Sequence, residues 1–167
     1  ANLMSAYHKV AANKGAPGVD HVTIEDFTAR LYANTSKLEA QLRTKQYRPQ
    51  AIRRVRIPKP GTRETRPLGI PTVRDRVVQA AIRNVIEPIL ERQFAEHSYG
   101  FRPGRGCKDA LRRVDRLVKA GYKHTVDVDL KSYFDTIPHD RLLAELRKYI
   151  ADNSLIGLVA QFLQASI

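Results

Sequence analysis

The residues best suited to chemistry are two aspartates in a short alternating segment. Asp127 and Asp129 alternate with apolar residues over 123–130, which predicts a β-strand there. Because alternate residues of a strand point to the same face, both carboxylates would lie on one side. Mg²⁺ is usually held by one or two carboxylates together with substrate phosphates, so the pair fits a magnesium site. The alternative is a structural strand whose aspartates face water.

Basic residues surround this acidic pair in the sequence. The net charge is +12, and two blocks supply it: nine basic residues against one acidic over 43–66, and eight against two over 102–124. Arginine, which outnumbers lysine in both blocks, can bind two phosphate oxygens at once. The charge indicates a polyanionic partner, although an ordinary solvated surface would also account for it. Basic phosphate binders beside acidic metal ligands favour phosphoryl transfer on a nucleotide or nucleic acid.

Several other classes of protein do not fit the composition. The single cysteine, Cys107, excludes an internal disulfide and a multi-cysteine zinc site. The histidines lack metal-ligand spacing, and neither of the glycine-rich phosphate-loop patterns is present. No apolar run approaches the roughly 18 residues of a membrane span, and no signal peptide is visible. We therefore expect a soluble, cytoplasmic protein without a membrane partner.

The elements that must position these residues can be read from the hydrophobic periodicity. Segments 51–57 and 66–71, joined by a glycine- and proline-rich turn, predict a basic β-hairpin. A helix is expected from Thr72, its N-cap, to residue 94, with Pro88 kinking or dividing it. The pair Thr23 and Asp26 predicts a capped helix before the hairpin. Further helices are expected over 1–13, 108–119, 140–150 and 154–167.

The helix over 108–119 has an apolar side and a basic side. We expect Leu111, Val114 and Val118 to face the interior and the arginines to face solvent. Gly121 would end this helix. The preceding loop, 98–106, contains three glycines and a proline.

Three motifs in order resemble the reverse transcriptases encoded by bacterial group II introns. They are 59–79 (KPGTRETRPLGIPTVRDRVVQ), 98–105 (SYGFRPGR) and 129–139 (DLKSYFDTIPH), and 14–20 (KGAPGVD) resembles the N-terminal extension of that family. The resemblance implies an α+β fold: a fingers lobe of helices with a basic β-hairpin, then the opening strand and helices of a palm. It also implies a division into 1–122, the N-terminal extension and fingers with loop 98–106 contacting template, and 123–167, the start of the palm.

The resemblance assigns roles to individual residues. Asp129 matches the first catalytic aspartate, a ligand of both Mg²⁺ ions, and the carbonyl of Leu130 would complete the shell of one ion. Phe134 matches the residue that excludes a 2′-hydroxyl from the incoming nucleotide. Lys59 and Arg66 match the residues that bind the dNTP triphosphate, and Lys131 is assigned to the same nucleotide site. The expected nucleic-acid-binding residues are Arg54, Arg56, Arg63, Arg102, Arg105, Arg112 and Arg113. No role is assigned to Asp127.

The function implied is RNA-templated DNA synthesis from a DNA primer and dNTPs, together with binding of intron RNA and help in its splicing and mobility. Family members can also form a homodimer through the N-terminal part. The Tyr/Phe-x-Asp-Asp motif that supplies the other catalytic aspartate does not occur in these residues. We therefore expect a piece of a longer enzyme that cannot polymerise DNA by itself. The alternatives are a non-catalytic RNA-binding module, or a retron, diversity-generating or CRISPR-linked reverse transcriptase.

Overall fold

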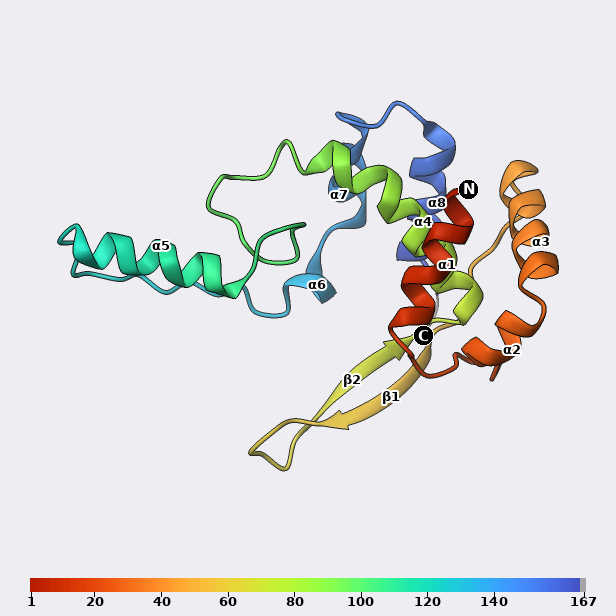
Figure 1. Cartoon of the computed structure of the whole chain (residues 1–167), viewed down its shortest axis with the longest axis horizontal. Helices are drawn as coiled ribbons and strands as arrows, with labels where there is room; N and C mark the ends of the chain where they lie inside the picture. The colour runs from red at the N-terminus through yellow and green to blue at the C-terminus, as the bar shows by residue number, and fades with distance from the viewer. Residues whose placement is uncertain (166–167) are drawn as a thin grey trace.

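A computed structural model describes residues 1–165 and shows helices around a small core with two projecting parts (Figure 1). One projection is a β-hairpin and the other is a helix, α5, at the end of a long loop. The mixture of helices with one antiparallel hairpin agrees with the α+β fingers region expected. In chain order the elements are α1 (Asn2–Ala12), α2 (Ile24–Ala29), α3 (Leu31–Arg43), β1 (Arg53–Pro58), β2 (Thr65–Ile70), α4 (Val73–Leu90), α5 (Cys107–Lys119), α6 (Tyr133–Thr136), α7 (His139–Arg147) and α8 (Asn153–Leu163).

The core lies between α1 and α4, which run side by side (Figure 1). Ala6 on α1 and Val77 and Val78 on α4 are completely buried there. The end of the chain returns to this core, because Phe162 on α8 packs against it, with its ring centroid 6.0 Å from that of Tyr47. We call α1, α2, α3, α4 and α8 the body.

Side-chain caps set the starts of two body helices, as the sequence predicts. The Thr23 hydroxyl accepts a hydrogen bond from the Asp26 backbone N–H, and the Asp26 carboxylate accepts one from the Thr23 N–H. The Thr72 hydroxyl caps α4 by accepting a hydrogen bond from the Asp75 backbone N–H, without a reciprocal bond from the Asp75 carboxylate. The helix expected after Thr23 was wrong in its continuity, and Pro88 does not divide the helix that follows Thr72. The helix after Thr23 breaks at Arg30 into α2 and α3, and α4 continues to Leu90 through Pro88, which lies in its last turn.

A buried carboxylate joins the start of α4 to the segment that leads into the hairpin. Asp75 is only 1 % exposed. Its Oδ1 accepts a hydrogen bond from the Tyr47 hydroxyl (2.5 Å) and its Oδ2 one from the Gln50 N–H (2.9 Å). Burial, followed by the hydrogen bond to Asp75, raises the pKa of the Tyr47 hydroxyl. Since unpaired buried polar groups are costly, these bonds fix the chain just before β1.

The turn over 14–20 holds the base of the hairpin against α4. Its carbonyl groups accept hydrogen bonds from Arg76 on α4 (to Ala16, 2.8 Å) and from Arg53 on β1 (to Pro17, 3.2 Å). Gly18 packs so closely that a Cβ there would lie 2.7 Å from the Thr72 backbone. The turn that resembles the family's N-terminal extension therefore packs between α4 and the base of the hairpin and connects them.

The hairpin has the predicted alternation. Arg54 and Arg56 on β1 are exposed, while the residues that alternate with them, Arg53, Val55 and Ile57, are half-buried. The strands pair antiparallel, with Arg53 opposite Ile70 and Ile57 opposite Arg66. This register places Arg66 near the tip of the hairpin, because only the pair of Pro58 and Thr65 lies between it and the turn.

Two expectations fail in the region after α4. Residues 123–130 form no strand, and Val126 is 87 % exposed. A strand requires a hydrogen-bonded neighbour, and none of residues 1–165 pairs with this segment. The opening strand expected for a palm is therefore absent from the described structure.

The apolar face of α5 is exposed rather than inward, because no other described element covers it; its residues are Leu111, Val114 and Val118. Gly121, at φ +94°, ends α5 as predicted.

Among residues 1–165, no helix combines the length and the apolar character that crossing a membrane requires.

Candidate nucleotide and nucleic-acid site

A cavity of about 780 Å³ brings together residues from two distant parts of the sequence. Arg66 and Pro67 of β2 form one wall, and the segment from Val128 to Asp135 forms the other. Four of the residues assigned to the nucleotide and metal sites thus line one space: Arg66, Asp129, Leu130 and Phe134. The volume lies within the 300–1,000 Å³ typical of small-molecule sites.

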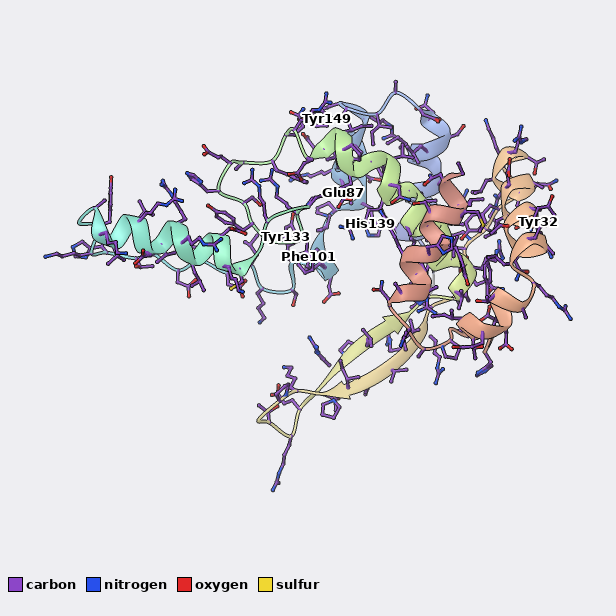
Figure 2. All side chains as sticks on the ribbon, in the orientation of Figure 1. Tyr32, Glu87, Phe101, Tyr133, His139 and Tyr149 are labelled. Atoms are coloured by element: carbon purple, nitrogen blue, oxygen red, sulfur yellow. The ribbon has the colours of Figure 1, made fainter. Side chains whose placement is uncertain are left out.

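The acidic and aromatic wall owes its shape to a sharp turn before α6. Ser132 has a φ of +52°, in the left-handed region that non-glycine residues seldom occupy. The turn lets Phe134 on α6 line the same cavity as Asp129. The ring of Phe134, which is 84 % exposed, packs edge-to-face on Tyr133 at 5.5 Å between centroids. Tyr133 marks this wall in the side-chain view (Figure 2).

The other residues expected at the nucleotide site lie outside the cavity lining. Lys59 follows the end of β1, and its ammonium group contacts the Glu64 carboxylate at 2.7 Å across the hairpin turn. Lys131 is exposed and does not line the cavity, although its sequence neighbours Leu130 and Ser132 do. Arg54, Arg56 and Arg63 lie exposed on the hairpin. By register, Arg56 lies opposite Pro67, next to Arg66.

The carboxylates present define what kind of metal site this cavity can offer. Among the described residues, no group of three or more His, Cys, Asp or Glu side chains could hold a metal ion. Two carboxylates, Asp129 and Asp135, line the cavity. Mg²⁺ commonly binds through one or two carboxylates plus substrate phosphates. The donors therefore fit a metal that nucleotide phosphates help to hold, rather than one enclosed by these residues alone.

Arg102 differs from the other arginines because it is buried. Its side chain is 6 % exposed, and Nε and Nη2 both donate to Glu91 Oε1, at 3.0 and 2.7 Å. Nη1 donates to the carbonyls of Ala95 (2.7 Å) and Ser98 (3.0 Å). The hydrogen bond from Arg102 is the main cause that lowers the pKa of the Glu91 carboxyl. In this structure the Arg102 guanidinium holds the loop after α4 together instead of facing solvent.

The remaining predicted nucleic-acid-binding residues gather in a second cavity. Arg105, Arg112 and Arg113 line a space of about 300 Å³ between loop 98–106 and the first turns of α5. Arg116, one turn further along α5, also lines it, as does Tyr99.

Sequence reasoning missed some residues of both cavities. Asp135 lies within the quoted 129–139 motif, so its proximity to Asp129 in sequence was the available signal. Arg116 follows Arg112 by four residues and Arg113 by three, which places all three on one side of a helix. His97 and Tyr99 carried no signal of their own, because only the fold of the loop brings them to the arginines.

Comparison with known proteins decides the family. Residues 57–167 match the family described as reverse transcriptase (RNA-dependent DNA polymerase). The chain belongs to the reverse transcriptase family. The match includes the end of β1, all of β2, loop 98–106 and both walls of the larger cavity. Members of this family generally use divalent metal ions.

Curated relatives point to the group II intron branch that the motifs resemble. The chain is 36 % identical over 162 residues to the group II intron-encoded protein LtrA of Lactococcus lactis, covering 96 % of this chain and 26 % of that protein. It is 39 % identical over 169 residues to protein YkfC of Escherichia coli, covering 98 % of this chain and 44 % of that protein. A putative COX1/OXI3 intron 1 protein of Saccharomyces cerevisiae is 36 % identical, with 98 % of this chain and 19 % of that protein covered. The chain spans less than half the length of each of these three relatives.

Proposed function

We propose that these residues form the nucleotide- and template-binding part of an RNA-directed DNA polymerase of group II intron type. The observation that carries this proposal is the shared cavity of Arg66, Asp129 and Phe134. It joins a cation for phosphates, a carboxylate for a metal and an aromatic ring for the sugar. The basic surfaces on the hairpin and α5 would hold RNA template and DNA primer.

Each cavity residue has a defined task in this proposal. Arg66 would bind the triphosphate of the dNTP and offset the charge that develops on the leaving pyrophosphate. Asp129 and the Leu130 carbonyl would hold Mg²⁺, which neutralises the phosphates and supports in-line attack by the primer 3′-hydroxyl when the ions are bound. Phe134 would fill the space that a ribose 2′-hydroxyl needs. Lys59 and Lys131 would contribute from the edge of the site, Lys59 after release from Glu64.

Sugar discrimination tests this assignment most specifically. In a reverse transcriptase that contains these residues and the Tyr/Phe-x-Asp-Asp motif, Phe134→Ala should raise incorporation of UTP relative to dTTP. The measurement is single-nucleotide primer extension, read as kcat/KM for each nucleotide. The control is Tyr122→Ala, which alters an exposed aromatic residue outside the cavity. An unchanged ratio for Phe134→Ala would remove this residue from the sugar site.

Affinity for the triphosphate tests the opposite wall. Arg66→Ala should raise the KM for dNTP by about tenfold or more, because a charged hydrogen bond of roughly 1.5–3 kcal/mol is lost. Arg43→Ala, which removes an exposed arginine at the end of α3, is the control. Equal KM values for the two variants would contradict the assignment of Arg66.

A non-catalytic RNA-binding role for the 167 residues alone is the second candidate. The exposed arginines of the hairpin, Arg54, Arg56 and Arg63, favour it. We therefore expect the purified chain to bind RNA with a steep salt dependence and to give no primer extension. Incorporation of any dNTP by the pure chain would contradict this view, and RNA affinity that is independent of salt would contradict a charge-driven site.

Some broader parts of the proposal concern the whole protein. The relatives named as intron-encoded support binding of intron RNA and help in splicing and mobility. We propose the cytoplasm as the compartment, a division near residue 122 between fingers and palm, and a homodimer through the N-terminal part. The exposed Tyr32 on α3 offers a surface for such a contact (Figure 2).

A further inference from the structure

The smaller cavity, at the start of α5, contains more positive charge than its acidic neighbours can balance. Four arginines line it: Arg105, Arg112, Arg113 and Arg116. The only carboxylates in its lining are those of Glu96 and Asp109. Like charges three or four residues apart on a helix repel, so this arrangement costs stability unless an anion compensates.

Two of these arginines are free for a ligand. Arg112 binds Asp109 at 2.8 Å, and Arg105 donates to the Glu96 carbonyl. Within residues 1–165, the side chains of Arg113 and Arg116 form no ion pair and no hydrogen bond. The Nε of Arg113 is buried and has no hydrogen-bond partner. A buried donor without a partner is rare in folded proteins and calls for an explanation. Arg113 therefore has hydrogen-bonding capacity that no described residue uses.

The opposite wall is formed by the loop that Arg102 holds. Because Arg102 donates to the carbonyls of Ala95 and Ser98, it fixes the backbone that carries His97 and Tyr99. Tyr99 is half-buried and lines the cavity with the arginines. An aromatic ring beside phosphate-binding groups is the combination used to bind single-stranded nucleic acid, with a base stacked on the ring.

We propose that this cavity binds a backbone phosphate of single-stranded RNA through Arg113 and Arg116, with the adjacent base stacked on Tyr99. The proposal rests on the proposed function for the identity of the polyanion, and it adds a second contact point that is separate from the nucleotide cavity. The volume of about 300 Å³ suits one phosphate with its neighbouring nucleotide rather than a duplex. Arg102 is a positioning residue for this site and does not touch the RNA.

Salt dependence of RNA binding tests the phosphate contact. Affinity of the 167-residue chain for a labelled oligouridylate of about ten nucleotides is measured by fluorescence anisotropy at several salt concentrations. Arg113→Gln and Arg116→Gln should each reduce the slope of log affinity against log salt concentration by about 0.7. Each variant should therefore lose about fivefold more affinity at 0.1 M salt than at 1 M salt. Lys119→Gln removes one charge from the same helix outside the cavity and should leave the slope unchanged. Arg113→Lys should retain the wild-type slope.

A fluorescence readout tests the stacking contact without relying on an arginine variant. The chain contains no tryptophan, so Tyr99→Trp provides a single reporter. RNA should quench its emission at the same concentrations that change the anisotropy, and inorganic phosphate alone should not. Quenching by phosphate but not by RNA would indicate a simple anion site and overturn the proposal.

The two levels of the hypothesis fail in different ways. If wild-type protein binds RNA with a steep slope but both arginine variants match Lys119→Gln, the cavity proposal is overturned and the proposed function stands. If wild-type protein does not bind RNA, the proposed function fails as well. Circular dichroism of each variant confirms folding, and Tyr99→Trp decides the question if an arginine variant does not fold.

Discussion

The body and the α5 region use the same kind of amphipathic helix with opposite results. On α4, Val77 and Val78 are fully buried against α1. On α5, Val114 is 55 % exposed, and no side chain of that helix is buried within the described residues. The contrast shows that an apolar stripe predicts a helix and its preferred face but does not say what covers that face.

The residues that we propose for binding are concentrated on the less packed side of this contrast. Asp129, Phe134 and the arginines of α5 are on segments with little buried surface, while the body supplies the core. Arg66 stands on a hairpin whose base is tied to the body through Asp75 and the 14–20 turn. We therefore expect substitutions in the body to reduce stability and substitutions near the cavities to alter binding.

The largest expected effect is at Asp75. Replacing it with alanine leaves the Tyr47 hydroxyl and the Gln50 N–H without an acceptor inside the protein. Asp75→Ala should lower the free energy of unfolding by about 2–4 kcal/mol, measured by urea denaturation. Asp115→Ala on α5 removes an exposed carboxylate and should change it by less than about 0.5 kcal/mol. Equal losses would show that α5 contributes to the cooperative core.

A pair of valines tests the same contrast with apolar groups. Val78→Ala should lower the free energy of unfolding by about 2 kcal/mol, because it removes two methyl groups from a closed core. Val118→Ala on α5 should have an effect below about 0.5 kcal/mol. Thermal or urea denaturation of both variants provides the comparison, and a large effect at Val118 would mean that its face is covered in solution.

Two glycines differ in how closely the chain packs around them. A Cβ on Gly18 would lie 2.7 Å from backbone atoms of Thr72, whereas one on Gly100 would meet nothing within 4 Å. Gly18→Ala should therefore cost about 1–3 kcal/mol of stability. Gly100→Ala should be close to neutral in the same denaturation assay. A neutral Gly18→Ala would show that the 14–20 turn is not wedged against α4.

The smallest effect is a pH dependence at Arg102 and Glu91. Since Arg102 lowers the pKa of the Glu91 carboxyl, the pair adds stability above the ordinary pKa of glutamate, about 4.3. That contribution is lost as the pH falls through the lowered pKa of the folded state. Glu91→Gln should therefore differ most from wild type at pH 6 and approach it near pH 3 in thermal denaturation. A constant difference would exclude this ion pair as the cause.

Local signals in the sequence predicted local structure well. Thr23 with Asp26 and Thr72 gave correct helix starts, and the β1 alternation gave the exposed face of Arg54 and Arg56. A cap needs only residues three positions apart, and a hairpin needs only its own two strands. These features do not depend on the rest of the molecule.

Features that depend on distant partners were not predictable in the same way. The period-two pattern over 123–130 indicated a strand, but a strand also needs a neighbour, and none is present among the described residues. The burial of Arg102 depends on Glu91, which no motif connected to it. The shared cavity of Arg66 and Asp129 followed from family resemblance, because 63 positions of sequence separate them and no local pattern joins them.

Two aspartates in one segment allow the most direct test of the proposed nucleotide site. Asp127 and Asp129 are both exposed and have the same chemistry, but only Asp129 lines the cavity with Arg66. The measurement is primer extension by a reverse transcriptase that contains these residues, comparing Asp129→Asn with Asp127→Asn. The account predicts that Asp129→Asn abolishes DNA synthesis while RNA binding persists, and that Asp127→Asn retains synthesis. Retained synthesis in Asp129→Asn would contradict it.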